Sequence, residues 1–176
     1  HIYANRFVDE IEYPLLALVV SGGHTELVYI QEEFNFNILG STQDDAVGEA
    51  YDKVARAMGL GYPGGPKIDK LAKQGKKHYP LPKVKTQKEL DFSFSGLKSA
   101  VLQTLKRHEE EGIVVEDLAY DFQEAVMLEL LDKTRKALNQ NDVKHLVLGG
   151  GVAANSRLRE LILELKNEYP DLKITI

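Results

Sequence analysis

The segment LGGGVAANSR, residues 148–157, constrains the fold most, because an apolar run enters three glycines and leaves into a helical pattern. Residues 143–148 are mostly apolar and predict a buried strand. After the glycines, apolar residues at i, i+3, i+4 and i+7 predict one helix face: Leu158, Leu161, Ile162 and Leu165. Asn155 is a natural N-cap for this helix. The segment therefore predicts a strand, a tight turn and a helix in succession.

Glycines at this turn would let a ligand approach the backbone, because they carry no Cβ atom, and the N–H groups of the first helical turn favour anions. A plain connection between strand and helix is the alternative. Gly149, Gly151 and Ala154 also fit the dinucleotide fingerprint G-x-G-x-x-A, but Asp171 precedes the next apolar run instead of following it. No Gly-Lys-Ser/Thr follows the glycines, which argues against a P-loop.

The composition is that of one ordinary domain, with 176 residues and 43% hydrophobic content. The sequence contains no cysteine, which excludes disulfides, cysteinyl zinc sites and iron-sulfur clusters. No apolar run reaches the roughly 18 residues of a membrane span, so we expect a cytoplasmic protein without a membrane partner. The chain begins at His1 without a methionine and stops inside the apolar run 172–176, so we expect a fragment of a longer protein.

The charge is unevenly distributed. The chain has a net charge of −5, but residues 67–88 hold eight lysines and the single acid Asp69. A basic segment of this kind can contact nucleic-acid phosphates, with binding that depends on salt. A solvated lysine-rich loop is the alternative.

Hydrophobic patterns predict the remaining elements. Strands are expected at 15–20, 25–31 and 36–42, the first two joined by a turn at Gly22-Gly23. Helices are expected at 46–58 with Asp45 as cap, after the turn at 62–66, from 96 toward 107, and at 116–138, while residues 1–12 resemble the end of a helix. A hairpin followed by alternating helices and strands indicates an α/β sandwich with a mixed sheet.

Four sequence blocks occur together: VVSGGHTE at 19–26, DDAVGEAYDK at 44–53, YPGGP at 62–66 and GGGVAAN at 149–155, with FSFSGLK at 92–98 between them. In this order they resemble the TsaD family, the tRNA threonylcarbamoyladenosine transferases formerly described as O-sialoglycoprotein endopeptidases. The resemblance implies the actin-like ATPase, sugar kinase and Hsp70-type (RNase H-like) fold, with two lobes around a nucleotide cleft. Residues 15–176 would be the second, C-terminal lobe, incomplete at its end, and residues 1–14 the remnant of a metal-binding helix between the lobes.

The resemblance also implies substrate-binding residues: Val19, Val20, Ser21, Gly22, Gly23, Asp52, Gly65, Asp69 and Asn155. Main-chain N–H groups at Gly22 and Gly23 suit an anion, and the two aspartates suit ribose hydroxyls. Gly65 would admit the sugar without a Cβ clash. The structural alternatives are an Asp52 pair with Arg56, an Asp69 pair with Lys73, and a simple turn glycine.

A metal site is implied only in part. The family has an H-x-x-x-H pair and a later aspartate that hold one divalent metal, iron or alternatively zinc, and His1 corresponds to the second histidine. The other ligands fall outside the chain, and one imidazole cannot impose a coordination geometry. We therefore expect the fragment alone to be inactive.

The resemblance implies transfer of a threonylcarbamoyl group from threonylcarbamoyl-AMP to N6 of the adenosine beside the anticodon, in tRNAs that read ANN codons. The implied partners are the tRNA anticodon arm and TsaB-like and TsaE-like proteins. The alternatives are a phosphotransferase or ATPase of the same fold that binds an ATP-type nucleotide, and a non-catalytic nucleotide-binding scaffold. A peptidase is disfavoured, because the sequence lacks H-E-x-x-H and His24 has no evident Ser-His-Asp partners.

Overall fold

The computed structural model describes residues 10–176, in which five strands form one mixed sheet in the order β3-β2-β1-β4-β5. The strands are β1 (Leu15–Val20), β2 (Thr25–Ile30), β3 (Phe36–Ser41), β4 (His145–Gly149) and β5 (Lys173–Thr175). The central strand β1 pairs antiparallel with β2 and parallel with β4. The predicted mixed sheet is confirmed.

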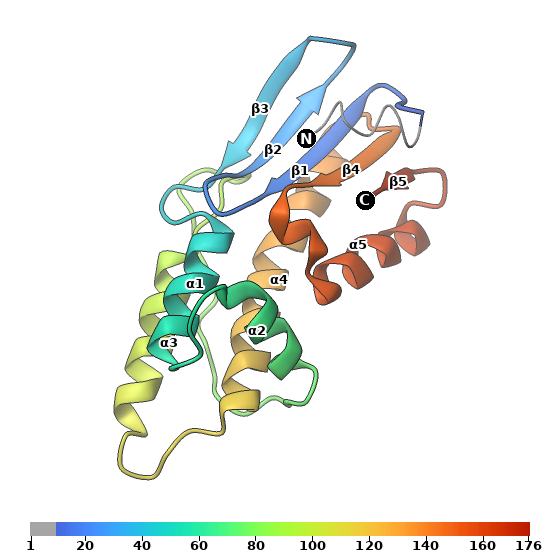
Figure 1. Cartoon of the computed structure of the whole chain (residues 1–176). Coiled ribbons are helices and arrows are strands. Elements are labelled where there is room, and N and C mark those ends of the chain that lie inside the picture. The colour runs from blue at the N-terminus through green and yellow to red at the C-terminus, as the bar shows by residue number, and fades with distance from the viewer. Residues whose placement is uncertain (1–9) are drawn as a thin grey trace.

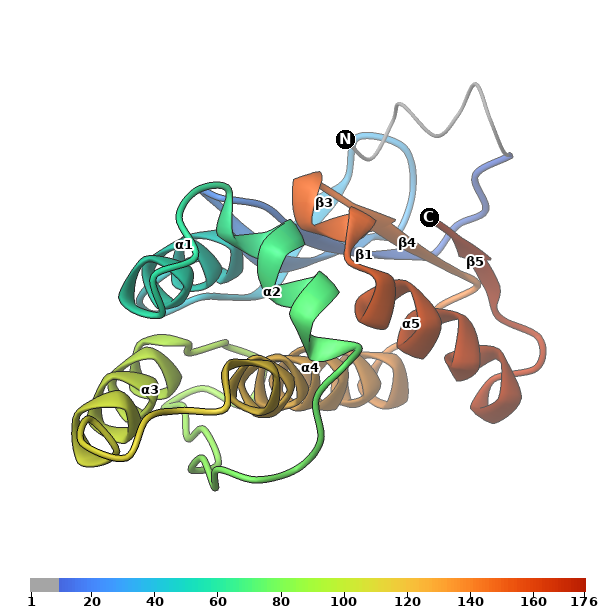
Figure 2. The ribbon, with the colours of Figure 1, turned by 60° about the horizontal axis from the view of Figure 1, so that its bottom comes forward.

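The helices lie on one side of this sheet, as two views 60° apart show (Figures 1 and 2). They are α1 (Val47–Ala57), α2 (Gly64–Ala72), α3 (Ser95–Arg107), α4 (Val115–Gln140) and α5 (Ser156–Glu168), with the short 3-10 helix η2 (Gly151–Ala154) before α5. In Figure 2, α1, α2 and α5 lie nearer the sheet than α3 and α4. None of the helices in the described part of the chain is long and apolar enough to cross a membrane.

The main core lies between the sheet and the helices. Leu16, Leu18 and Val20 on β1 join it, whereas Leu15 and Ala17 belong to a smaller cluster on the other face of the sheet. Each fully buried leucine contributes about 1.5–3 kcal/mol by leaving water. Because β1 is buried on both faces, its carboxyl end, where the Gly22-Gly23 turn begins, has a fixed position.

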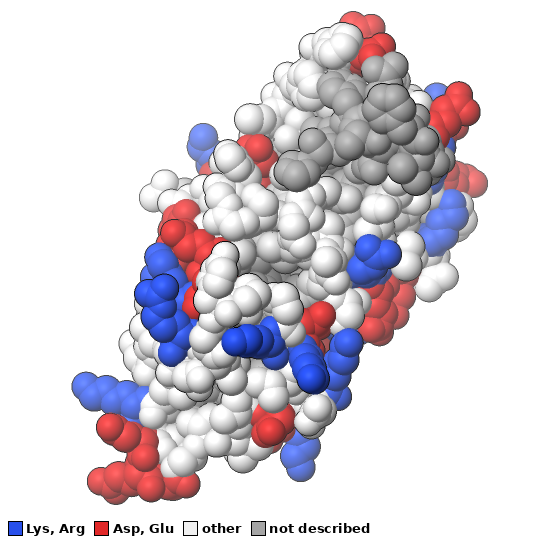
Figure 3. All heavy atoms as spheres, in the orientation of Figure 1, with Lys and Arg blue, Asp and Glu red and all other residues white. Residues whose placement is uncertain are grey.

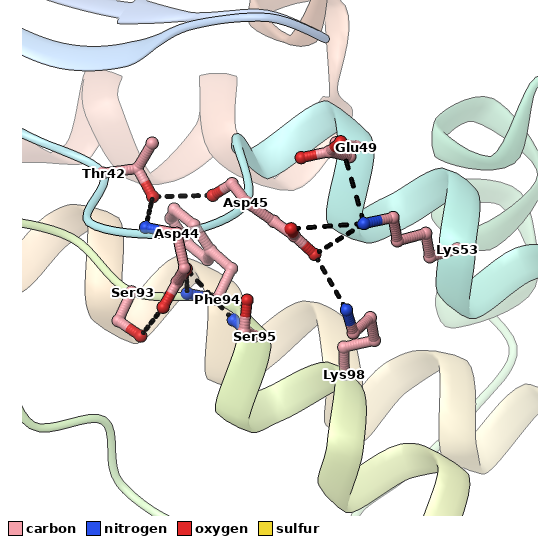
Figure 4. A network of polar contacts seen from close by, with 9 residues as sticks. All are labelled: Thr42, Asp44, Asp45, Glu49, Lys53, Ser93, Phe94, Ser95 and Lys98. Atoms are coloured by element: carbon pink, nitrogen blue, oxygen red, sulfur yellow. Dashed lines mark hydrogen bonds and ion pairs between the residues drawn. The ribbon is translucent and has the colours of Figure 1, made fainter.

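The start of α1 differs from the prediction that Asp45 caps it. The N-cap residue is Ala46, which makes no side-chain cap, and the Val47 N–H donates instead to Oγ1 of Thr25 at 2.9 Å. The Asp45 carboxylate points away from the helix end and pairs with Lys53 and Lys98, each at 3.2 Å (Figure 4). The two lysines on α1 and α3 therefore decide where this carboxylate lies.

Two further predictions need correction. The segment 62–66 is only partly a turn, because α2 begins at Gly64, and Pro66 fits the first helical turn, where no backbone N–H is needed. Residues 10–12 are not helical, and residues 1–9 of the predicted helix end lie outside the described part. By contrast, Asn155 caps α5 as predicted, accepting a hydrogen bond from the Leu158 N–H at 2.9 Å.

Candidate functional site

A cavity of about 630 Å³ lies between the Gly22 turn, α1, α2 and the glycine turn before α5. It brings together five of the nine predicted substrate-binding residues: Gly22, Asp52, Gly65, Asp69 and Asn155. They come from four segments that are far apart in sequence. The other four, Val19, Val20, Ser21 and Gly23, do not line the cavity.

Asp52 connects α1 to the start of α2. Its Oδ1 atom accepts a hydrogen bond from the Gly64 N–H at 2.9 Å, and no ion pair between Asp52 and Arg56 forms in the described structure. The proposed pairing with Arg56 is therefore not what holds this carboxylate. Gly64 must be glycine here, because a Cβ atom would lie 2.7 Å from the Tyr51 carbonyl oxygen. This close contact places Gly65 beside Asp52 at the cavity.

The Asp69 side chain, on α2, contacts the N-terminus of α5. Its Oδ2 accepts from the Ser156 N–H at 2.9 Å, and its Oδ1 accepts from the Ser156 hydroxyl at 2.7 Å. A carboxylate at this end of a helix is stabilised by the helix dipole. The alternative of an Asp69 ion pair with Lys73 is not realised among the described residues.

This arrangement changes the interpretation of the glycine turn as an anion site. The sequence predicts that the N–H groups at the start of α5 are available to a ligand. Two of them are already satisfied, that of Ser156 by Asp69 and that of Leu158 by Asn155. Side chains of the protein itself therefore satisfy part of this helix end, which leaves fewer N–H groups for a ligand than the sequence predicts.

Ser21 stabilises the Gly22-Gly23 turn through hydrogen bonds to the backbone of the turn. The Ser21 hydroxyl oxygen accepts from the His24 N–H at 3.0 Å and from the Gly23 N–H at 3.4 Å. The Ser21 carbonyl accepts from the Gly48 N–H at 3.1 Å, which ties the turn to α1. Ser21 thus positions the turn, and only Gly22 reaches the cavity.

Val19 and Val20 are buried in β1. They affect the site through the backbone of β1, which lies beside the glycine turn. The carbonyl oxygen of Val20 would lie 2.2 Å from a Cβ atom at residue 150, and Gly150 has a φ of +97°. Only glycine meets both conditions at low cost. The backbone of β1 and that of the glycine turn are therefore too close to admit a Cβ atom at residue 150.

The cavity also includes residues that the sequence did not single out as ligand contacts, among them Tyr51, Tyr62, Lys70 and Lys73. Tyr62 is 79% exposed, so its ring is accessible to a planar ligand. Lys70 and Lys73 form no ion pair within the described chain, and basic side chains gather over α2 (Figure 3). The two lysines could have been found from the sequence, because they belong to the basic segment 67–88. Tyr51 could not, because in the sequence it is one of the apolar residues expected to face the core from α1.

A buried network joins the cavity wall to α4. The Tyr51 hydroxyl donates to Gln123 Oε1 at 2.7 Å, and Gln123 Nε2 donates to Asp69 Oδ1 at 3.0 Å. Burial, together with the charge of Asp69, raises the pKa of Tyr51 well above its usual range. The phenol therefore stays protonated and keeps its role as a donor.

The described residues do not offer a metal centre. Between residues 10 and 176 there is no group of three or more His, Cys, Asp or Glu side chains that could hold a metal ion. His1, the one implied ligand, lies outside the described residues. The residues of the described cavity therefore do not fit the implied metal.

Comparison with known proteins identifies the fold and the family. Residues 1–175 match the family model TsaD, tRNA N6-adenosine threonylcarbamoyltransferase. Proteins with this name from Bacillus licheniformis and Bacillus subtilis are 52% and 57% identical to the chain, covering 100% and 90% of it. The chain spans 52% and 47% of these two relatives, about half their length.

Two solved structures show the fold at low sequence identity. Component A of (R)-2-hydroxyglutaryl-CoA dehydratase from Acidaminococcus fermentans matches 98% of the chain and 58% of that protein, with a TM-score of 0.56 and 16% identity. The activator of 2-hydroxyisocaproyl-CoA dehydratase from Clostridium difficile with bound ADPNP matches 94% and 55%, with a TM-score of 0.53 and 13% identity. Both neighbours share the fold of the chain over nearly its whole length. From the match over nearly its whole length and the identity with curated members, the chain belongs to the TsaD family.

Proposed function

We propose that the full-length protein containing this segment transfers a threonylcarbamoyl group from threonylcarbamoyl-AMP to N6 of the adenosine beside the anticodon, in tRNAs that read ANN codons. The observation that carries this proposal is the convergence of Asp52, Gly65, Asp69 and Asn155 on one cavity in a chain of the TsaD family. The names of the curated relatives support the reaction class.

The cavity suits the adenylate. Asp52 uses Oδ1 for the Gly64 N–H, and its carboxylate has further acceptor capacity for a ribose hydroxyl. The exposed ring of Tyr62 offers a stacking surface to the adenine base. Lys70 and Lys73 line the same cavity and supply positive charge for the phosphate.

The chemistry explains why such a donor is needed. The exocyclic amine of adenosine is a weak nucleophile, and the mixed anhydride is an activated acyl group. The amine nitrogen attacks the carbonyl carbon, the bond from this carbon to the phosphate oxygen breaks, AMP leaves and the nitrogen loses a proton. Cations beside the phosphate favour AMP as a leaving group, because they stabilise the charge that develops on it.

The remaining parts of the proposal involve groups outside the described segment. One divalent metal, iron or alternatively zinc, would be held by His1 together with ligands elsewhere in the full-length protein, and we assign no step to it. The proposed partners are the tRNA anticodon arm and TsaB-like and TsaE-like proteins. We propose a cytoplasmic location, since tRNA is modified there.

A second candidate is a phosphotransferase or ATPase. It is favoured by the fold shared with an activator whose structure contains ADPNP. A non-catalytic nucleotide-binding scaffold is the third. Both predict binding of a nucleotide in the same cavity, but neither predicts transfer to tRNA.

One experiment separates these candidates. Full-length protein with its partner proteins is incubated with threonylcarbamoyl-AMP and unmodified tRNA, and nucleosides from the digested tRNA are analysed by mass spectrometry. Threonylcarbamoyladenosine should accumulate with time and enzyme concentration. ATP turnover with a sugar acceptor and no modified adenosine would favour the phosphotransferase, and nucleotide binding without either product would favour the scaffold.

A further inference from the structure

Gln123 is buried in α4, with 3% of its surface exposed, and does not line the adenylate cavity. Its side chain nevertheless contacts three residues that do: Tyr51 on α1, Asp69 on α2 and Asn155 before α5. One amide from a fourth element therefore joins the three elements that form the cavity wall. No local sequence pattern distinguishes this glutamine from the other polar residues of α4.

The direction of every hydrogen bond in this cluster is fixed. Asn155 Oδ1 accepts from the Leu158 N–H, so Asn155 Nδ2 is the atom that donates to Gln123, at 2.7 Å. Gln123 Oε1 therefore faces this donor and the Tyr51 hydroxyl.

With Oε1 committed in this way, Nε2 must face Asp69 Oδ1, 3.0 Å away. The carboxylate can only accept, and Ser156 donates to it twice from the other side. Reversing the Gln123 amide would place donor against donor and acceptor against acceptor.

We propose that Gln123 is a positioning residue for adenylate binding, which acts by holding Asp69 and Asn155 in their orientations at the cavity. This inference rests on the proposed function for the identity of the ligand. The amide makes no contact with the ligand itself. Its required property is a donor toward Asp69 combined with an acceptor toward Tyr51 and Asn155.

The test is Gln123→Glu in the full-length protein, because a glutamate keeps the shape and the acceptor but loses the donor. When ionised, the introduced carboxylate repels Asp69, whereas its protonated form donates to Asp69. Burial beside another carboxylate raises the pKa of the new group, so protonation occurs in an accessible pH range. We expect KM for threonylcarbamoyl-AMP to rise about tenfold at pH 8, and the ratio of variant to wild-type KM to fall as the pH is lowered toward 5.5.

Gln103→Glu is the matched control, since it makes the same chemical change at an exposed position of α3 and should leave KM unchanged at every pH. If the KM ratio for Gln123→Glu is one throughout, or is raised by the same factor at every pH, Gln123 does not act through its donor and the proposal is wrong. Should this variant fail to fold, Gln123→Met fills a similar volume without the amide. A folded Gln123→Met protein with wild-type KM would equally overturn the proposal.

Direct binding of AMP, measured by calorimetry on the same proteins, keeps this test separate from the proposed reaction. Weaker AMP binding by Gln123→Glu at pH 8, recovering at pH 5.5, supports the positioning role even if no tRNA is modified. In that case the proposed function fails and the role of Gln123 stands. Normal AMP binding at both pH values, with tRNA modification intact, gives the opposite result.

Discussion

The carbonyl oxygen of Val20 lies where a Cβ atom on Gly150 would come within 2.2 Å of it. Gly150 also has a φ of +97° and a ψ of 168°, a conformation that costs an L-residue about 1–3 kcal/mol. Gly150→Ala should therefore lower the free energy of unfolding of the full-length protein by about 2–5 kcal/mol, combining strain with overpacking. Urea unfolding measures this loss.

Gly151→Ala is the control for that prediction. It lies one residue further along the same turn, and a Cβ atom there would meet nothing within 4 Å. Its effect on the free energy of unfolding should stay within about 1 kcal/mol. Equal losses for the two alanine variants would mean that the contact with Val20 does not set the requirement for glycine.

Asp52 should affect both ligand binding and stability, because its carboxylate accepts from the Gly64 N–H and also lines the cavity. Asp52→Ala should lower the free energy of unfolding by about 1 kcal/mol and the AMP affinity by about tenfold to a hundredfold. Asp52→Asn keeps an acceptor for Gly64, so its stability should be close to wild type while its AMP affinity remains reduced. Calorimetry and thermal melting measure the two effects. Normal AMP binding by Asp52→Ala with a lowered Tm would leave Asp52 only a structural role.

Much of the fold could be predicted because its signals are local. The apolar run 15–20, the glycine turn and the alternation that follows specify the hairpin, and the observed strands end within one residue of the predicted limits. The cap at Asn155 could be predicted for the same reason, since its partner Leu158 is three residues away.

The partners of the site residues could not be predicted, because they are distant in sequence. Lys73 is four residues from Asp69 and is the obvious local counterion, yet the carboxylate binds Ser156, 87 residues later. Asp45 similarly pairs with Lys98 instead of capping the adjacent helix. Competition between local and distant partners is decided by how the helices pack, which hydrophobic periodicity does not specify.

The Asp45 cluster predicts a pH dependence of stability. Burial opposes the ionised carboxylate, but hydrogen bonds and charge from Lys98 and Lys53 lower the pKa of Asp45 below its ordinary value of 3.8 (Figure 4). Its ionised form therefore stabilises the fold above about pH 4, and this contribution is lost as the pH falls through the folded-state pKa. Lys98→Gln should reduce Tm at pH 7 and by a smaller amount at pH 3.

Lys106→Gln removes a charge from the same helix at an exposed position and serves as the control. Its effect on Tm should be small and should not depend on the ion pair of Asp45. If the Tm difference between Lys98→Gln and wild type is the same at pH 3 and pH 7, ionised Asp45 does not contribute through Lys98.

The lysine-rich segment 67–88 offers a test of the proposed tRNA contact. Lys77 and Lys83 line a second cavity of about 840 Å³ between this segment and α4, whereas Lys85 and Lys88, exposed in the same loop, do not. In the full-length protein, Lys77→Gln with Lys83→Gln should weaken tRNA binding and reduce the slope of log K against log salt by about 0.7–0.9 per lost phosphate contact. The affinity for AMP should stay unchanged.

Lys85→Gln with Lys88→Gln removes the same charge from the same segment. If the phosphates of the tRNA bind along the second cavity, the Lys85 and Lys88 substitutions should change the slope of log K against log salt less than the Lys77 and Lys83 substitutions do. Equal reductions of the slope by the two pairs would indicate that the tRNA contacts the whole basic segment, because each lost charge would then have the same effect at any position in it. If neither pair alters the affinity or the slope, the segment is a solvated surface, and the tRNA phosphates bind elsewhere on the full-length protein or its partners.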